Sequence, residues 1–233
     1  MTLPYFYEPS IQVFNQTFTL SEETSKHCVQ VLRMREQEAL KLTDGKGNAF
    51  TATITDADKK HTVVTITEST FEPSPQKKLS VGISLLKNAS RFEWFLEKAT
   101  EIGVTEIYPL LCKRTERQHF RHDRLNGILI AAMLQSQQVW LPTLHEPLKY
   151  ADALNQMNHS SQLIAHCEEG KKKHIKELSL SEDMCMLIGP EGDFSTEEIT
   201  LAQQKNFIPV TLGNTRLRTE TAAIVAVTLL INN

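Results

Sequence analysis

Two short apolar segments that each run into a glycine-containing loop constrain the fold of this chain more than any other feature. The first segment leads into residues 189–192 (Gly-Pro-Glu-Gly), and the second leads into Leu212-Gly213. A helix is predicted after each loop. In α/β sheets, ligands bind where strands end in such loops, and glycine lets the backbone approach a ligand closely. The pattern therefore predicts that the two loops meet in space and form one binding pocket.

The two helices that follow these loops have distinct start signals. Ser195 and Glu198 have the spacing of a capping box, with Phe194 and Ile199 placed to form a hydrophobic staple. The last helix is predicted from about Thr219 and is apolar on nearly every side. Such a helix is buried, either in a core or in a subunit interface. It is too short for a membrane span.

Composition narrows the class of protein. The chain has 233 residues, of which 40% are hydrophobic and 23% charged, and its net charge is −3. A strongly basic nucleic-acid binder is therefore excluded, and any such surface must be local. No signal peptide is evident at the N-terminus. Scattered cysteines without a C-x-x-C pair predict reduced thiols in a cytoplasmic protein, at Cys28, Cys112, Cys167 and Cys185.

The order of predicted elements indicates two domains. Residues 1–73 are rich in β-branched residues and predict a small barrel or sandwich with one helix over Ser21–Glu36, in which Val29, Val31 and Leu32 are apolar positions. Residues 72–78 form a proline-bearing linker. In residues 74–233 strands and helices alternate, which predicts a parallel sheet with helices on both faces.

Within this second domain the predicted helices are 90–102, with a Ser90–Glu93 capping box, 125–140 and 171–178. Gly103 is expected to end the first of them. No G-x-G-x-x-G follows the first strand, so an ordinary dinucleotide-binding fold is disfavoured.

Local positive charge suggests where an anion could bind. Between residues 113 and 124 five cations oppose two acids, and this stretch is about equally consistent with a solvated loop and with RNA contact. For Arg33 and Arg35, cations near a helix C-terminus are the somewhat better interpretation. Arg216 and Arg218 lie within the second glycine loop, which favours a role in the site. His119 and His122 could share a helix face, but a basic surface is favoured over a metal site.

The paired motifs at residues 188–195 and 212–222 closely resemble those of the RsmE family of 16S ribosomal RNA uridine methyltransferases, which belongs to the SPOUT class. The resemblance extends over the whole chain. Tyr5-Phe6 and His27 with residues 31–33 are similar to the family's N-terminal domain, and residues 97–104 are similar to its middle motifs, as are Pro109-Leu110 and Arg114.

The resemblance implies an α/β fold with a SPOUT-type trefoil-knotted parallel sheet, plus a small N-terminal PUA-like β-barrel. It implies S-adenosylmethionine as methyl donor, N3 of one uridine as acceptor, 16S rRNA or the small ribosomal subunit as partner, a homodimer and no membrane. The expected donor-binding residues are His166, Gly189, Pro190, Glu191, Gly192, Leu212, Gly213, Leu217, Arg218, Glu220, Thr221 and Ala222. The expected RNA-binding residues are His27, Arg33, Arg35, Lys113, Arg117 and Arg121.

Three departures from the family pattern stand out. Asp193 and Gln37 occupy positions where glycine is expected, and residues 134–138 keep a glutamine but lack the flanking Glu and Arg. The last departure weakens any catalytic or dimer role for charges in that segment.

Removal of the uridine N3 proton leaves negative charge on the ring, and arginine is suited to stabilise it. Arg218 or Arg114 is predicted for this role, and Glu191 and Glu220 are candidate proton acceptors. Two alternatives stay open: a SPOUT enzyme acting on tRNA, and a non-catalytic RNA-binding protein of the same fold.

Overall fold

The computed structural model describes residues 3–14, 16–116 and 119–233 and separates the chain into two compact units. The first unit comprises Met1–Ser74 and Met133–Leu141, and the second comprises Pro75–Ala132 and Pro142–Asn233. The division of the sequence into domains 1–73 and 74–233 stays a prediction. In the described part of the chain, no helix is both long enough and apolar enough to cross a membrane.

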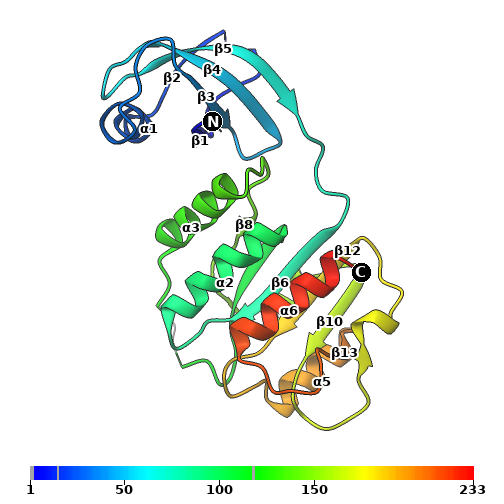
Figure 1. Ribbon diagram of the computed structural model, residues 1–233. Coiled ribbons are helices and arrows are strands. Elements are labelled where there is room, and N and C mark those ends of the chain that lie inside the picture. Colours follow the sequence, from blue (N-terminus) through cyan, green and yellow to red (C-terminus); the bar gives the residue numbers. More distant parts are fainter. Residues whose placement is uncertain (1–2, 15, 117–118) are drawn as a thin grey trace. The chain divides into compact units, whose positions relative to one another are not determined.

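One curled five-stranded sheet forms the first unit (Figure 1). Its strand order is β1-β3-β4-β5-β2, and only the β1–β3 pair is parallel. The strands are β1 (Tyr5–Tyr7), β2 (Thr17–Thr19), β3 (Ala39–Thr43), β4 (Asn48–Asp56) and β5 (Val63–Phe71). Alternate residues of β4 (Phe50, Ala52, Ile54) are buried, as expected for a sheet with one core face. Of the two predicted forms, barrel or sandwich, the single sheet excludes the sandwich.

The helix of the first unit is shorter than predicted. Ser21 caps α1 (Glu22–Lys26) by accepting a hydrogen bond from the Thr24 amide, as expected, and a π-helical turn, η1 (His27–Val31), follows. Arg33 then adopts a left-handed φ of 57°, which ends the helix before Glu36. Because the π turn changes the helical period, Val31 and Leu32 are 65% and 44% exposed rather than packed on an apolar face.

The segment Met133–Leu141 belongs to the first unit through Trp140. This residue pairs with Lys46 in an isolated bridge, and its indole Nε1 donates to the Glu72 carbonyl at 3.0 Å. The predicted helix over 125–140 therefore ends early. Helix α3 (His122–Gln135) stops where Gln137 takes a left-handed φ of 58°.

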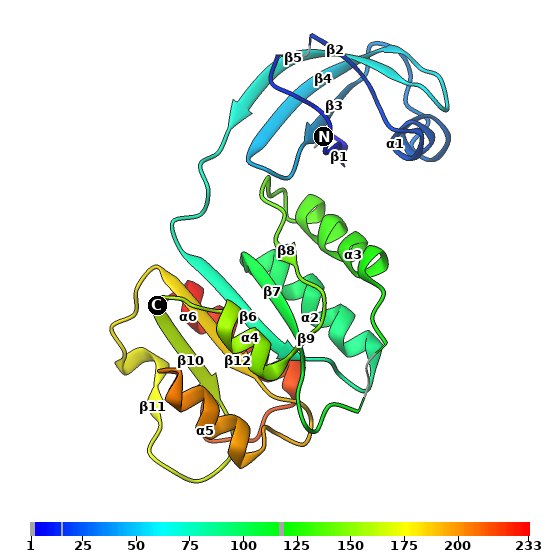
Figure 2. The ribbon, with the colours of Figure 1, turned by 180° about the vertical axis from the view of Figure 1, so that it is seen from behind.

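A parallel eight-stranded sheet organises the second unit, with the order β11-β13-β10-β12-β6-β7-β8 and β9 paired to β7. The strands are β6 (Lys78–Ser84), β7 (Glu106–Leu111), β8 (Thr143–Leu144), β9 (Leu148–Lys149), β10 (Ser161–Ala165), β11 (Lys173–His174), β12 (Asp183–Ile188) and β13 (Ile208–Thr211). Helices α2 (Ala89–Ile102) and α6 (Thr219–Ile231) cover one face, and α4 (Tyr150–Gln156) and α5 (Thr196–Gln204) cover the other (Figures 1 and 2). This confirms the predicted layers. Strand β6 is buried at six consecutive positions, as is typical of a strand covered on both faces.

Two local predictions for the second unit were wrong. The N-cap of α2 is Asn88, whose side chain accepts from the Ser90 amide, so Ser90 and Glu93 do not form the expected capping box. Residues 171–178 form no α-helix; they contain β11 and a single 3₁₀ turn, η2 (Ile175–Glu177). Strand β11 pairs with β13, and this long-range pairing overrides the local helical pattern.

Gly103 and Gly127 allow a matched test of backbone conformation, because they differ in whether the position suits alanine. Gly103 ends α2 at φ 107°, whereas Gly127 lies inside α3, and a Cβ at either position meets no atom within 4 Å. Gly103→Ala should lower the free energy of unfolding by about 1 kcal/mol because alanine disfavours a left-handed φ. Gly127→Ala should raise it by about 0.5–1 kcal/mol because alanine favours helix. Urea denaturation measures both free energies of unfolding. Changes of the same sign in the two variants would contradict the backbone conformations described for Gly103 and Gly127.

Candidate functional site

The register of three parallel strands brings three loops to one edge of the second unit's sheet. Ala165, the last residue of β10, pairs with Ile188 of β12 and with Val210 of β13. The residues that follow these strands therefore leave the sheet side by side. Ligands bind at the carboxyl ends of parallel strands in this way.

A cavity of about 750 Å³ lies between these loops. Its size is within the range of pockets that hold small molecules and cofactors. The predicted donor-binding residues that line it are His166, Gly189, Pro190, Glu191, Leu212, Gly213, Leu217, Arg218 and Ala222. Gly192, Glu220 and Thr221 were predicted with them but do not line the cavity. The expectation that the two glycine loops meet is thus met by the structure.

The loop after β12 is fixed by the elements on either side of it. Ser195 and Glu198 form the predicted capping box at the start of α5, and Phe194 and Ile199 lie in one buried cluster. A Cβ on Gly189 would lie 3.0 Å from both the amide nitrogen and a ring carbon of the fully buried Phe194. A side chain at this position would therefore force Phe194 to shift, and glycine avoids this close contact.

Asp193 ends this loop with a left-handed backbone, at φ 66°. Its carboxylate accepts hydrogen bonds from the amide of Cys167 at 2.7 Å and from the amide of Phe194 at 2.8 Å. Gln37, the other position where the sequence suggested glycine, has a φ of 70° in the first unit. The family pattern thus located two left-handed positions that this chain fills with side chains.

The two arginines predicted for catalysis have different surroundings. Arg218 lines the cavity and is exposed, as is Arg216. Arg114 does not line the cavity; its Nη1 donates to the carbonyl oxygens of Gly192 at 2.7 Å and Phe194 at 3.3 Å. In this structure Arg114 therefore supports the loop from outside the cavity.

Two cations at the cavity were missed from the sequence. Arg91, in the first turn of α2, lines the cavity and has its Nε 3.5 Å from Oε1 of the buried Glu220. Lys172, which lies in the predicted helix over 171–178, also lines the cavity and donates to the His166 carbonyl at 2.7 Å. The one available signal for Arg91 was its position just after a strand, where loops face the ligand edge.

Several buried polar atoms at the site lack partners. Both ring nitrogens of His166 are buried without a hydrogen-bond partner, and so is Oε2 of Glu220. Burial, reinforced by the nearby Lys172 ammonium, holds the pKa of the His166 ring below its usual value. A neutral imidazole can donate at one nitrogen and accept at the other, so His166 is able to bind either kind of ligand group.

The predicted RNA-binding residues lie in both units. In the first unit, His27 is exposed and packs edge-on against Phe6 with ring centroids 5.6 Å apart, and Arg33 and Arg35 are exposed. In the second unit, Lys113 lies 3.4 Å from Glu197 across an exposed ion pair. Arg121 is exposed at the start of α3. Arg117 lies outside the described residues.

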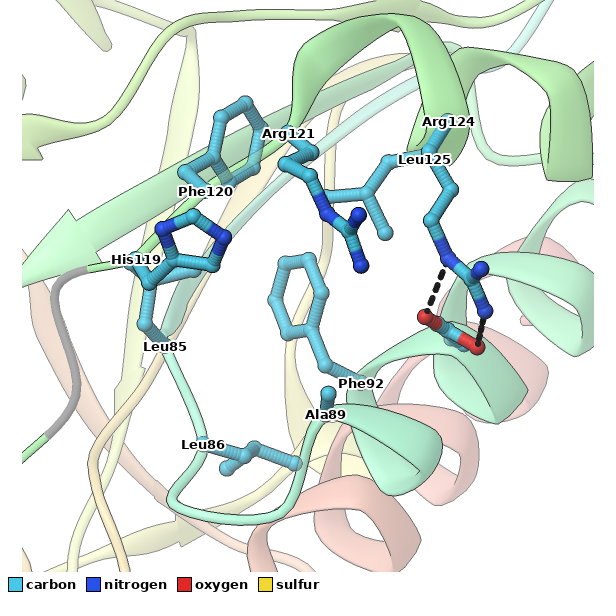
Figure 3. Close-up of a pocket in the computed structure, with 10 residues that line it drawn as sticks. Leu85, Leu86, Ala89, Phe92, His119, Phe120, Arg121, Arg124 and Leu125 are labelled. Carbon is cyan, nitrogen blue, oxygen red and sulfur yellow. Dashed lines mark hydrogen bonds and ion pairs between the residues drawn. The ribbon is translucent and has the colours of Figure 1, made fainter.

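A second, smaller hollow lies between α2 and the segment before α3 (Figure 3). Leu86, Phe92 and Leu125 contribute apolar walls, Arg121 points toward Phe92, and Arg124 forms a two-pronged ion pair with Glu93 at 3.0 and 3.1 Å. Its volume of about 50 Å³ is too small for a nucleotide cofactor. Within residues 3–14, 16–116 and 119–233, no cluster of His, Cys, Asp and Glu is arranged to hold a metal ion.

Comparisons with known proteins identify the family. A family model described as an RNA methyltransferase domain matches residues 72–231, and one described as an RNA methyltransferase PUA domain matches residues 20–67. The crystal structure of a probable rRNA-methyltransferase from Porphyromonas gingivalis is similar, with 34% identity, a TM-score of 0.89 and coverage of 98% of each chain.

Two relatives carry a more specific name. A ribosomal RNA small subunit methyltransferase E from Neisseria gonorrhoeae, solved bound to S-adenosyl methionine, is 31% identical with a TM-score of 0.87. The similarity covers 97% of this chain and 95% of that one. The curated protein of the same name from Rickettsia conorii is 29% identical over 218 residues, covering 91% of this chain and 88% of that protein.

The parallel sheet with its three-loop cavity and the curled N-terminal sheet are those of SPOUT-class RNA methyltransferases that carry a PUA-like domain, which confirms the predicted fold class. Within that class, the chain belongs to the RsmE family of ribosomal RNA methyltransferases. The resemblance inferred from the paired loop motifs is confirmed.

The lowered pKa of His166 has a measurable consequence. The ring should titrate below the ordinary histidine pKa of about 6.5 and be neutral at pH 7. Since the unfolded chain binds this proton at a higher pH than the folded chain does, stability should fall as the pH drops below about 6.5. NMR titration of the ring measures the pKa, and the signal that is missing in His166→Gln belongs to His166. The same variant should lose less stability at low pH than the wild type. A midpoint above 6.5 would contradict the burial argument.

Proposed function

We propose that this chain uses S-adenosylmethionine to methylate N3 of a specific uridine in the 16S rRNA of the small ribosomal subunit. The carrying observation is the 750 Å³ cavity that three loops form at the ends of β10, β12 and β13. Support comes from the relatives named ribosomal RNA small subunit methyltransferase E, one of which is solved with S-adenosyl methionine bound.

The residues at the cavity fit the proposed donor. His166, the loop from Gly189 to Glu191 and the loop from Leu212 to Arg218 would hold it, with Ala222 at the start of α6. Among the residues that the structure describes, the buried ring nitrogens of His166 have no hydrogen-bond partner, and a polar ligand would supply one. When bound, the donor supplies a methyl group on a positively charged sulfur.

Three of the predicted donor-binding residues are proposed to support the donor site from outside the cavity, namely Gly192, Glu220 and Thr221. Glu220 ion-pairs with the cavity-lining Arg91, and Gly192 offers its carbonyl oxygen to Arg114. Each contact fixes a neighbour of the cavity, so the predicted set includes residues that support the pocket as well as residues that line it.

Methylation of the uridine requires a group that accepts the N3 proton and a cation near the uracil ring. Loss of the N3 proton places negative charge on the uracil ring, and a fixed arginine stabilises such charge in the transition state. Arg218 lines the cavity and is proposed for this role. Arg114 is the second candidate because its guanidinium donates hydrogen bonds to loop carbonyl oxygens. Glu191, which is exposed, and the buried Glu220 are the proposed proton acceptors.

The remaining partners follow from charge and from exposed apolar surface. Exposed cations in both units are proposed to bind rRNA phosphates, namely Arg33, Arg35, Lys113 and Arg121, together with His27 and with Arg117. A homodimer is proposed because Ile224, Val225 and Leu229 of the very apolar helix α6 stay partly exposed in the single chain. The ribosomal substrate implies a cytoplasmic location.

Calorimetry and a methylation assay test the proposal directly. S-adenosylmethionine should bind the purified chain, and small ribosomal subunits from a strain that lacks the modification should gain one methyl group on a uridine. Chromatography of the rRNA nucleosides against 3-methyluridine and 5-methyluridine standards identifies the methylated atom, and mass spectrometry of nuclease fragments locates the uridine in the rRNA. Deproteinised 16S rRNA and tRNA serve as parallel substrates. Absence of donor binding would favour a non-catalytic RNA-binding protein of the same fold. Methylation of tRNA alone would favour a SPOUT enzyme that acts on tRNA.

Removing Arg218 should slow the chemical step. We expect Arg218→Ala to lower the single-turnover rate at saturating S-adenosylmethionine by about 100-fold. This is the effect of removing one hydrogen-bond donor that stabilises negative charge in a transition state. Arg114→Ala should lower it less because that side chain acts through the loop. Lys205→Ala, which removes an exposed cation at the end of α5, is the matched control and should leave the rate unchanged. Wild-type rates in both arginine variants would refute the proposed roles.

A further inference from the structure

We infer that Asp193 is a positioning residue that ties the loop after β10 to the loop after β12 and thereby sets the shape of the donor pocket. The inference rests on the proposed function, because it concerns how that pocket is held ready for its ligand. It concerns a position where the family pattern led us to expect glycine.

The backbone at Asp193 would suit glycine better. Its φ of 66° is left-handed, a conformation that side chains other than Asn and Asp seldom adopt. Its amide donates to the Pro190 carbonyl at 2.9 Å and closes a tight turn. A non-glycine residue is strained here, so the side chain must contribute something that offsets the strain.

The side chain makes that contribution through both carboxylate oxygens. Oδ1 accepts from the amide of Phe194 at 2.8 Å, within its own loop. Oδ2 accepts from the amide of Cys167 at 2.7 Å, in the loop that follows β10. Hydrogen bonds to an ionised acceptor are shorter and stronger than neutral ones. One carboxylate therefore joins two loops that enter the cavity from different strands.

The position of this link matters because of its neighbours. Cys167 directly follows His166, and both line the cavity together with Asp193 itself. No described residue forms a hydrogen bond with the ring of His166, so the placement of the ring depends on the backbone around it. Two other contacts hold the same loop: Lys172 donates to the His166 carbonyl at 2.7 Å, and Thr196 donates to Glu168 at 2.7 Å. Of these ties, Asp193 is the one that reaches the backbone amide next to His166.

A glycine at 193 would relieve the strain and release the link at the same time. The loop after β10 would keep its Lys172 and Thr196 contacts but lose this link, so part of its ordering would occur when the donor binds and would weaken binding. The expected signature is a higher Kd and KM for S-adenosylmethionine with little change in kcat. A purely structural role would instead lower the melting temperature without this separation of KM from kcat.

The test compares three variants of the full chain. Asp193→Gly removes both acceptors and should raise the donor Kd about tenfold, as for the loss of one strong hydrogen bond. Asp193→Asn tolerates the left-handed φ and keeps one acceptor oxygen, so the rise should be smaller, about threefold. Gln37→Gly relieves a φ of 70° in the first unit, at a residue that is not among those lining the cavity, and should leave the Kd unchanged. Calorimetry measures the Kd, and hydrogen exchange of the ligand-free chain measures protection of the Cys167 amide.

Each outcome decides a separate point. Faster exchange at Cys167 in Asp193→Gly, together with weaker donor binding, supports the inference. Unchanged exchange, or wild-type affinity in a variant with faster exchange, overturns it. If the wild-type chain itself fails to bind the donor, the proposed function fails, and exchange at Cys167 alone then decides whether Asp193 ties the loops.

Discussion

The parallel pairing of β10 with both β12 and β13 is the constraint on which the site depends. Ala165 sits between Ile188 and Val210 in the sheet, so three loops that are far apart in sequence leave it at one edge. Both faces of this sheet are covered, and Leu163, Leu187 and Ile188 are buried. A shift in the pairing of any one strand would bury the wrong residues and misplace a loop at the same time. The stability of the core and the geometry of the cavity are therefore set by the same pairing.

Local signals in the sequence were sufficient for the parts of the site that follow from backbone chemistry. The glycine loops, the capping box of α5 and the start of α6 at Thr219 each depend on residues within one turn of one another, and each is present in the structure. Gly103 ends α2 for the same reason. The family pattern added the left-handed positions at Gln37 and Asp193, which no periodicity indicated.

What the sequence could not supply were contacts between distant segments. Arg91 reaches the cavity because α2 packs against α6, where Glu220 accepts its ion pair. The expected helix at 171–178 was overridden by the pairing of β11 with β13. Similarly, Arg114 and Arg218 were both predicted for catalysis, yet Arg114 bonds to carbonyl oxygens outside the cavity whereas Arg218 lines it. The contact between Arg114 and Gly192 joins residues 78 positions apart, so the sequence could not show that Arg114 supports the loop instead of lining the cavity.

The energetics of the site point to a bound ligand independently of any family resemblance. Folded proteins pair the large majority of their buried polar atoms, since each unpaired one costs about 1–3 kcal/mol. In the part of the chain that the structure describes, the buried side-chain nitrogen and oxygen atoms without partners belong to His166 and Glu220. His166 lines the cavity, and Glu220 contacts the cavity-lining Arg91. A ligand in the cavity could satisfy the ring nitrogens of His166, which lines it. A ligand that binds only the folded chain also stabilises it by mass action, so the same feature that lowers the stability of the free chain would favour the complex.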